Sequence, residues 1–390
     1  MMGKSNINAD SQADMDSWEF HLMYVAKMDS LKDEEKTRVL DGLAKLKQVF
    51  DDNWLRQARK EHHPIVAYIL NKVPWSQLWL ADFGTKLDAL KQIAALQSFD
   101  RLAGRLRSST QYAGAEAEVE TITKLIAAGI TDLELYPKVE VKGKPKEPEL
   151  RAVVHGEDVY FEVTALREPQ DSLDAWRTHQ ELTLSLFDLE TLHELLYFCQ
   201  IHKILSPPRI EEFKAKIRKA IAEVKQSKQF VYIGEQGVLD YLVIHRSNHE
   251  QCDALVKRFG MKQEASGPPF ETDDIRRLRH KLRKKHEQLP EDKPGVIVVF
   301  CSLLYFGSAE HFYADLVYQV EETIYKQDNI VLAAIINKTG ELGFVSEVDQ
   351  RPHYTLVRKS RNLVQESIVV LKNRYSKFAI NQKIVSALTS

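Results

Sequence analysis

Two short apolar runs limit the folds open to this chain more than any other feature. They read "GVIVVF" at 295–300 and "IVLAAII" at 330–336, and a helix is expected between them at about 311–326. Runs of this length, rich in β-branched residues and without polar alternation, are typical of strands that are covered on both faces. The pattern predicts an α/β protein with a mixed sheet flanked by helices.

The remaining segments suggest how this core is extended. Residues 1–110 are predicted to form a helical N-terminal module, because apolar residues recur there at helical spacing. Residues 111–390 are expected to form the α/β domain. Within it, residues 171–265 are predicted to be a mostly helical insertion. The formal net charge of −2 excludes a uniformly basic nucleic-acid coat, but it leaves local basic patches open.

One stretch of the expected sheet, "EPELRAVVHGEDVYFEVTAL" at 147–166, carries charge among strand-forming residues. The "HG" pair is a plausible tight turn between two strands, and side chains alternate between the two faces of a strand. Whether Val154 pairs with Glu157 or with Val159, Glu149 and Glu162 fall on the same face. That face also carries Tyr160 and Leu166, so we expect both carboxylates to be partly buried.

Two partly buried carboxylates repel each other unless a cation lies between them. Mg²⁺ or Mn²⁺ is the obvious candidate, because Mg²⁺ prefers carboxylate oxygens and retained waters. The alternative is structural, with Glu149 as the solvated end of a loop and Glu162 paired with Arg151 across the hairpin. The residue pattern leaves both alternatives open.

A third carboxylate lies on the preceding helix, "GAEAEVETITKLIAAG" at 114–129. At helical spacing Glu118 falls within the apolar stripe that includes Val119, Ile122 and Leu125. We therefore expect it to point at the sheet, with a position at the edge of the stripe, reaching out to water, as the alternative.

Taken together, these segments resemble the PD-(D/E)XK nuclease superfamily over roughly 111–170 and 271–305. The helix with Glu118, "PEL" with Glu149 and "FEVT" with Glu162 stand where that family carries its acidic residues. The resemblance implies a restriction-endonuclease-like mixed sheet, a metal held by Glu149 and Glu162, and Mg²⁺- or Mn²⁺-dependent hydrolysis of phosphodiester bonds. It also implies catalytic positions, at Glu118, Glu149, Glu162, Thr164 and Lys285.

Thr164 departs from the family, because it occupies the place of the motif lysine and carries no positive charge. A lysine must then arrive from elsewhere, with Lys285 and the loop residues Lys142, Lys144 and Lys146 as the candidates. Otherwise the site is weak or inactive.

A basic helix, at about 274–289, carries seven Lys or Arg and a single acid between Arg276 and Gln288. Such a helix is suited to contacting phosphates, and the alternative is an ordinary solvated amphipathic helix. The nucleic-acid-binding candidates on it are Arg276, Arg279, Arg283, Lys285 and Gln288. Lys285 and Gln288 also match by type the Lys or Gln that many members of the family place near the site.

The leading hypothesis is therefore a metal-dependent nuclease acting on DNA, possible roles being defence, restriction or mobile elements. Its rival is a catalytically inactive descendant that binds nucleic acid or protein, and a third possibility is an α/β protein unrelated to nucleases. A homodimer, or a partner protein bound through the helical N-terminal module, is compatible with each.

Three scattered cysteines, a polar N-terminus and the absence of a long apolar run favour a cytoplasmic protein without membrane contact.

Overall fold

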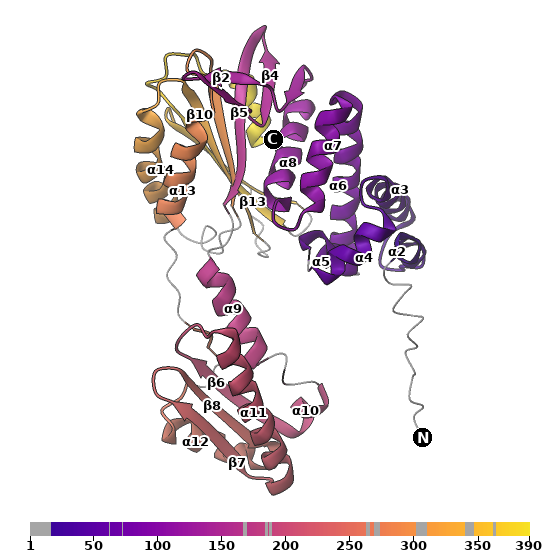
Figure 1. Cartoon of the computed structure of the whole chain (residues 1–390), viewed down its shortest axis with the longest axis vertical. Coiled ribbons are helices and arrows are strands. Elements are labelled where there is room, and N and C mark those ends of the chain that lie inside the picture. The colour runs from indigo at the N-terminus through magenta and orange to yellow at the C-terminus, as the bar shows by residue number, and fades with distance from the viewer. Residues whose placement is uncertain are drawn as a thin grey trace. The chain divides into compact units, whose positions relative to one another are not determined.

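The computed structural model describes residues 17–61, 63–71, 73–166, 170–183, 186, 189–262, 266–268, 274–301, 310–339, 347–361 and 364–390. The chain divides into two compact units (Figure 1). The first combines Met1–Arg167 with Asp274–Ser390, and the second is the inserted segment Glu168–Asp273.

The first unit is built around an eight-stranded sheet, in the order β1-β4-β5-β9-β10-β13-β12-β11. β9 is parallel to both β5 and β10, whereas every other neighbouring pair is antiparallel. The sheet is thus mixed, as predicted. Its strands are β1 (Leu133–Leu135), β4 (Leu150–Val154), β5 (Glu157–Leu166), β9 (Gly295–Cys301), β10 (Ile330–Thr339), β11 (Glu347–Gln350), β12 (Tyr354–Arg361) and β13 (Val364–Lys372).

Both faces of this sheet are covered by helices, which explains why its central strands are continuously apolar. Along β9, Val296 and Val298 face the cluster that includes α8 (Tyr112–Ala127). Ile297 and Val299 face the opposite cluster, which includes residues of α13 (Asp274–His286) and α14 (Glu310–Tyr325). Figure 1 shows the two groups of helices on opposite sides of the strands.

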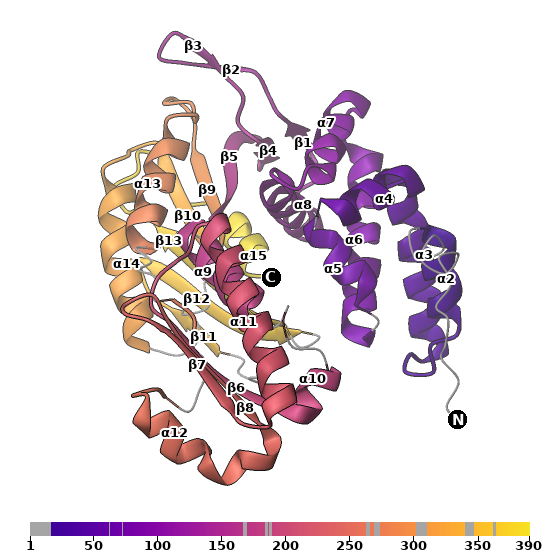
Figure 2. The same ribbon diagram turned by 60° about the horizontal axis from the view of Figure 1, so that its bottom comes forward.

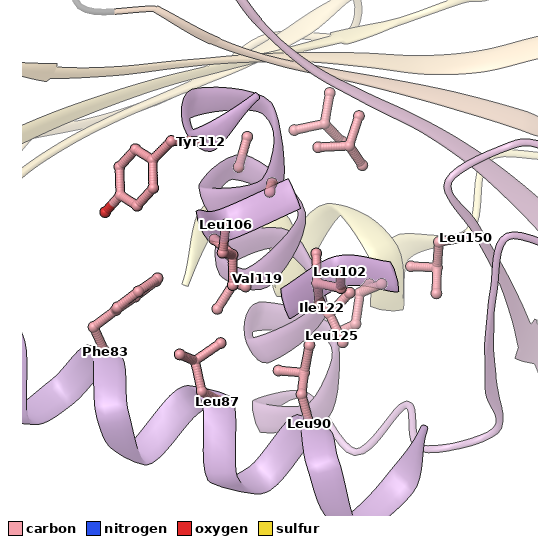
Figure 3. Close-up of a cluster of buried hydrophobic side chains, with 14 of the residues drawn as sticks. Phe83, Leu87, Leu90, Leu102, Leu106, Tyr112, Val119, Ile122, Leu125 and Leu150 are labelled. Atoms are coloured by element: carbon pink, nitrogen blue, oxygen red, sulfur yellow. The ribbon is translucent and has the colours of Figure 1, made fainter. Parts of the chain in front are cut away.

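Within residues 17–107, as far as the structure describes them, six further helices precede α8: α2 (Trp18–Ala26), α3 (Asp33–Val49), α4 (Asp52–Lys60), α5 (Pro64–Leu70), α6 (Pro74–Ile93) and α7 (Leu96–Arg107). Their buried side chains are continuous with those of α8 and the sheet. Figure 3 shows part of this shared core, with Leu87 of α6, Leu102 of α7 and Val119 of α8 among its side chains. Residue 110 therefore does not separate two hydrophobic cores.

A pair of glycines allows α3 and α6 to approach each other closely. A Cβ atom added at Gly84 would lie 2.2 Å from the carbonyl oxygen of Gly42. One added at Gly42 would lie 2.4 Å from the Cα of Ala81. The backbones of the two helices thus occupy the space that larger side chains would need.

The inserted unit has a small antiparallel sheet of its own, in the order β6-β8-β7. Buried residues of α11, Phe213 and Ile217, pack with Tyr241 on one face, and Leu255 of α12 packs with Leu242 on the other. The expectation of a mostly helical insertion misses this sheet. The elements are α9 (Gln170–Leu182), α10 (Leu189–Glu194), β6 (Leu195–Ile201), α11 (Pro207–Ser227), β7 (Phe230–Glu235), β8 (Leu239–His245), the 3₁₀ helix η1 (Arg246–Gln251) and α12 (Cys252–Arg258).

A small hairpin and the helix α15 (Gln382–Thr389) also belong to the first unit. The two-stranded hairpin, β2 (Val139–Val141) and β3 (Lys144–Lys146), forms a separate ribbon, and α15 packs on α8 and β13.

None of the helices among the described residues combines the length and the apolar character that crossing a bilayer requires. The three cysteines are free thiols.

Candidate active site

The hairpin of β4 and β5 positions the first two carboxylates. His155 and Gly156 form its two-residue turn, and both have positive φ, at 52° and 84°. This is the backbone that a type I′ turn requires, and it selects Val154–Glu157 as the first pair beyond the turn. The register continues to Leu150–Phe161, so the next position along places Glu149 opposite Glu162. The two carboxylates therefore share a face, as predicted.

Lys285 of α13 reaches both carboxylates. Its Nζ donates to Oε1 of Glu149 at 2.7 Å and to Oε2 of Glu162 at 2.6 Å. The side chain of Glu162 is fully buried, and those of Glu149 and Lys285 are 12% and 14% exposed. One ammonium group from a distant helix thus bridges a carboxylate on β5 and a second one directly before β4. Of the four lysines named from the sequence, it is this one that the described contacts place there.

The electrostatics of this cluster follow from its burial. Desolvation raises the pKa of Glu162 well above its usual range, the charge of Glu149 raises it further, and Lys285 opposes both. For Lys285 itself, burial acts to lower the pKa, but the two carboxylates outweigh it and the pKa is raised. The lysine therefore stays charged at neutral pH, whereas Glu162 takes up a proton more readily than a free carboxyl group.

The predicted alternative, in which Glu162 pairs with Arg151, does not match the structure. Arg151 pairs with Glu134 at 2.9 Å and with Asp158 at 2.7 Å, toward the other end of the hairpin. Nor is Glu149 a solvated loop end, since its Oε2 also accepts from the backbone amide of Val163 at 3.2 Å.

Glu118 is buried beside two partners that the sequence did not indicate. Its side chain is 1% exposed, and its Oε2 accepts from Nη1 of Arg105 at 2.9 Å and from the hydroxyl of Tyr136 at 2.7 Å. Desolvation raises the pKa of Glu118 to about 7, with Arg105 opposing and the charge of nearby Glu149 contributing. Glu118 thus belongs to the same electrostatic cluster as Glu149, and it does not reach out to water.

Tyr136 reaches Glu118 from an uncommon backbone conformation. Its φ is 55°, in a left-handed backbone region that residues other than glycine and asparagine seldom adopt. The guanidinium of Arg101 also lies over the ring of Tyr136, 4.1 Å from the ring centre. Strained positions of this kind cluster at functional sites.

Thr164 lies two residues beyond Glu162 and on the same face of β5. It is buried, and Nζ of Lys281 lies 3.5 Å from its hydroxyl oxygen. Lys281 precedes Lys285 by one helical turn, so both lysines extend from one face of α13 toward β5. In the sequence, the i, i+4 spacing from Lys285 is the signal that points to Lys281.

The other candidates on α13 occupy different surroundings. Arg276 and Arg283 are exposed, whereas Arg279 and Gln288 are half-buried. Leu278, Leu282 and Leu289 form the buried stripe that attaches the helix to the sheet. The described contacts place only Lys285 of these five candidates against the carboxylates.

The residues present fit a divalent cation in a limited way. The described part of the chain holds no group of three or more His, Cys, Asp or Glu residues arranged to bind a metal. Mg²⁺, however, is often bound through one or two carboxylates together with waters and substrate phosphates. Glu149 and Glu162 form such a pair, and Oε1 of Glu162 is buried without a hydrogen-bond partner.

Comparisons with known proteins return no relative. No family model matches the chain, and neither the curated proteins nor the solved structures contain a match. Conclusions about function therefore depend on the geometry of the cluster.

Proposed function

We propose that this chain is a metal-dependent nuclease with a restriction-endonuclease-like fold. The observation that carries the proposal is the contact of Lys285 with Glu149 and Glu162. The resemblance requires a lysine beside two acidic residues, and Thr164 does not provide one. Lys285 supplies the missing charge from α13.

The order of elements supports the same proposal. A helix with a buried acid, α8, precedes a hairpin with two further acids, and the parallel strand β9 follows α13. This is the order that the resemblance implies, with Glu168–Asp273 inserted between β5 and α13.

The proposed roles follow from charge and position. Glu149 and Glu162 would hold Mg²⁺ or Mn²⁺, which when bound lowers the pKa of a water and neutralises charge on a phosphate. The ammonium of Lys285 stabilises negative charge that develops on the attacking oxygen or on the phosphate. Glu118 would orient a water or a second metal, and with a pKa of about 7 it can be protonated or charged at neutral pH. Arg276, Arg279 and Arg283 would contact the backbone of DNA, the proposed substrate.

A second candidate function is a catalytically inactive subunit that binds nucleic acid or protein. The observation in its favour is the same ion pair, because Lys285 neutralises both carboxylates that a metal would need. In this alternative the lysine takes the place of the cation permanently.

Calorimetric titration of Mg²⁺ and of Mn²⁺, with a plasmid-nicking assay on the same samples, separates these functions. The variant is Glu162→Gln, and the matched control is Glu157→Gln, an exposed carboxylate on the same strand. Metal binding and nicking that are lost only in Glu162→Gln support a nuclease. Metal binding without cleavage of DNA or RNA contradicts the nuclease. No metal binding in the wild type contradicts the proposed metal site and favours the inactive subunit, in which Lys285 takes the place of the cation.

The oligomeric state is a further part of the proposal. Two such sites would allow both strands of a duplex to be cut in one encounter, so we propose a homodimer on DNA. Light scattering of the protein with and without a duplex tests this: a monomer in both samples contradicts it.

A further inference from the structure

A basic pocket of about 320 Å³ lies between the β2–β3 hairpin and the C-terminal end of α13. This volume is at the lower end of the roughly 300 to 1,000 Å³ found for small-ligand sites. Its lining is mainly charged, with Val141 and Leu289 as the apolar members. The other lining residues are Lys142, Lys144, Lys146, His286, Glu287 and Glu291.

The geometry of the hairpin directs its lysines into this pocket. Lys142 and Gly143 form a two-residue turn with positive φ, at 53° and 71°. The register then pairs Val141 with Lys144, and Val139 with Lys146. Residues that pair directly project from the same face of a hairpin. Because Val139 packs against the cluster that contains α13, this face is turned toward the helix. Figure 2 shows the hairpin as a ribbon of its own, beside β4 and β5.

The charges in the pocket leave two lysines available for a ligand. Lys142 pairs with Glu291 at 3.0 Å, and His286 contacts the side chain of Asn329 through Nε2 at 3.0 Å. Within the described residues, Lys144 and Lys146 have no ion-pair partner. Glu287 is the acid that opposes them, so the pocket retains a net positive charge and favours an anion.

The chain connects this pocket directly to the carboxylate cluster. Lys146 precedes Glu149 by three residues, and His286 and Glu287 follow Lys285 immediately. An anion in the pocket and a scissile phosphate at the cluster would therefore be neighbours on one strand.

We infer that this pocket binds a backbone phosphate of the nucleic-acid strand that enters the carboxylate cluster, with Lys144 and Lys146 as its ligands. The inference rests on the proposed function, and it adds a positioning site beside the cluster. Lys144 and Lys146 hold the strand, and they take no part in the chemical step.

The test is binding of a fluorescein-labelled duplex of about 20 base pairs, measured by anisotropy in EDTA so that no cleavage occurs. The variant is Lys144→Ala/Lys146→Ala. The matched control is Lys47→Ala/Lys91→Ala, which removes two exposed lysines from α3 and α6. Two lost phosphate contacts reduce the slope of log K against log salt by about 1.8. Raising the salt from about 50 mM to about 200 mM then weakens the wild type about tenfold more than the variant.

A second variant tests the sign of the effect. Glu287→Gln removes the opposing acid, so the duplex should bind about two- to threefold more tightly. Both results together support the inference.

The outcomes also separate this inference from the proposed function. A wild type that binds and cleaves DNA while the double lysine variant keeps the same affinity and salt slope overturns the inference alone. A wild type that binds no nucleic acid overturns both.

Discussion

Nζ of Lys285 lies 2.6 Å from Oε2 of Glu162, although 123 residues separate them in the chain. With the 2.7 Å contact to Glu149, this ammonium compensates two carboxylates in a region from which water is largely excluded. Arg105 does the same for Glu118. Most of the predictions below depend on these two cations.

Replacing Lys285 by Met should destabilise the protein by about 3 kcal/mol, because it leaves two facing carboxylates buried without a counter-charge. Urea unfolding of the variant measures this loss. The double variant Lys285→Met/Glu149→Gln removes one of the two charges and should recover part of the loss. Equal stability of the wild type and Lys285→Met would show that the ion pair contributes nothing.

A lysine at position 164 should compensate for the loss of Lys285 in catalysis. Thr164 lies on the face of β5 that carries Glu162, so Thr164→Lys returns the ammonium to the place that the resemblance expects. If the proposed function holds, the nicking activity that Lys285→Met removes should return in part in Lys285→Met/Thr164→Lys. The single variant Thr164→Lys controls for the added charge.

Glu118 should make the stability of the protein fall as the pH rises. Its pKa is about 7 when folded and that of an ordinary carboxyl group when unfolded, so the folded state holds the extra proton between these values. Its contribution is complete below about pH 4 and is lost as the pH passes through 7, up to about 3 kcal/mol. The difference in unfolding free energy between the wild type and Glu118→Gln, measured from about pH 5 to about pH 8, should show this slope. A difference that does not vary with pH contradicts it.

Arg151→Ala should have little effect. Its ion pairs with Glu134 and Asp158 lie at the partly exposed end of the hairpin, and pairs of this kind contribute about 0.5 kcal/mol. Urea unfolding and metal titration should both remain close to wild type. A large loss of metal binding would mean that Arg151, and not Lys285, supports the carboxylates.

Gly84→Ala should destabilise the protein by about 1 to 3 kcal/mol, since the added methyl group would overlap the backbone of α3. Gly104→Ala is the matched control: it lies within α7, and a Cβ there would meet nothing within 4 Å. That change should stabilise by about 0.5 to 1 kcal/mol through helix propensity. Thermal or urea unfolding of both variants distinguishes the close approach of the helices from a general effect of glycine.

Local patterns in the sequence predict part of this structure well. The side-chain alternation on β4 and β5 places Glu149 and Glu162 on one face, and the apolar runs at β9 and β10 predict two central strands. Both features depend on residues that are close in sequence, so simple periodicity reveals them. β13 and the strands of the inserted unit were not predicted, although they contain the apolar runs "IVVL" in β13, "LLYFC" in β6 and "YLVI" in β8. Apolar runs this short do not distinguish a strand from a buried segment of helix.

The partners of the carboxylates were harder to identify. Lys285 was one of four candidate lysines, and only the packing of α13 on β5 and β9 selects it. Arg105 reaches Glu118 because α7 packs against α8, and Tyr136 does so through a left-handed backbone position. These contacts depend on how elements pack in three dimensions, which residue spacing does not report.

The position of the insertion also affects how the protein is made. Glu149 and Glu162 are synthesised before Glu168–Asp273, whereas Lys285 and the neighbouring strand β9 come after it. At roughly 5 to 20 residues per second, the 123 residues from Val163 to Lys285 take about 6 to 25 s to translate. During this interval β5 has only β4 beside it among its final neighbours in the sheet, and the two glutamates have no lysine. The nascent chain therefore completes this cluster only after the whole inserted unit has been synthesised.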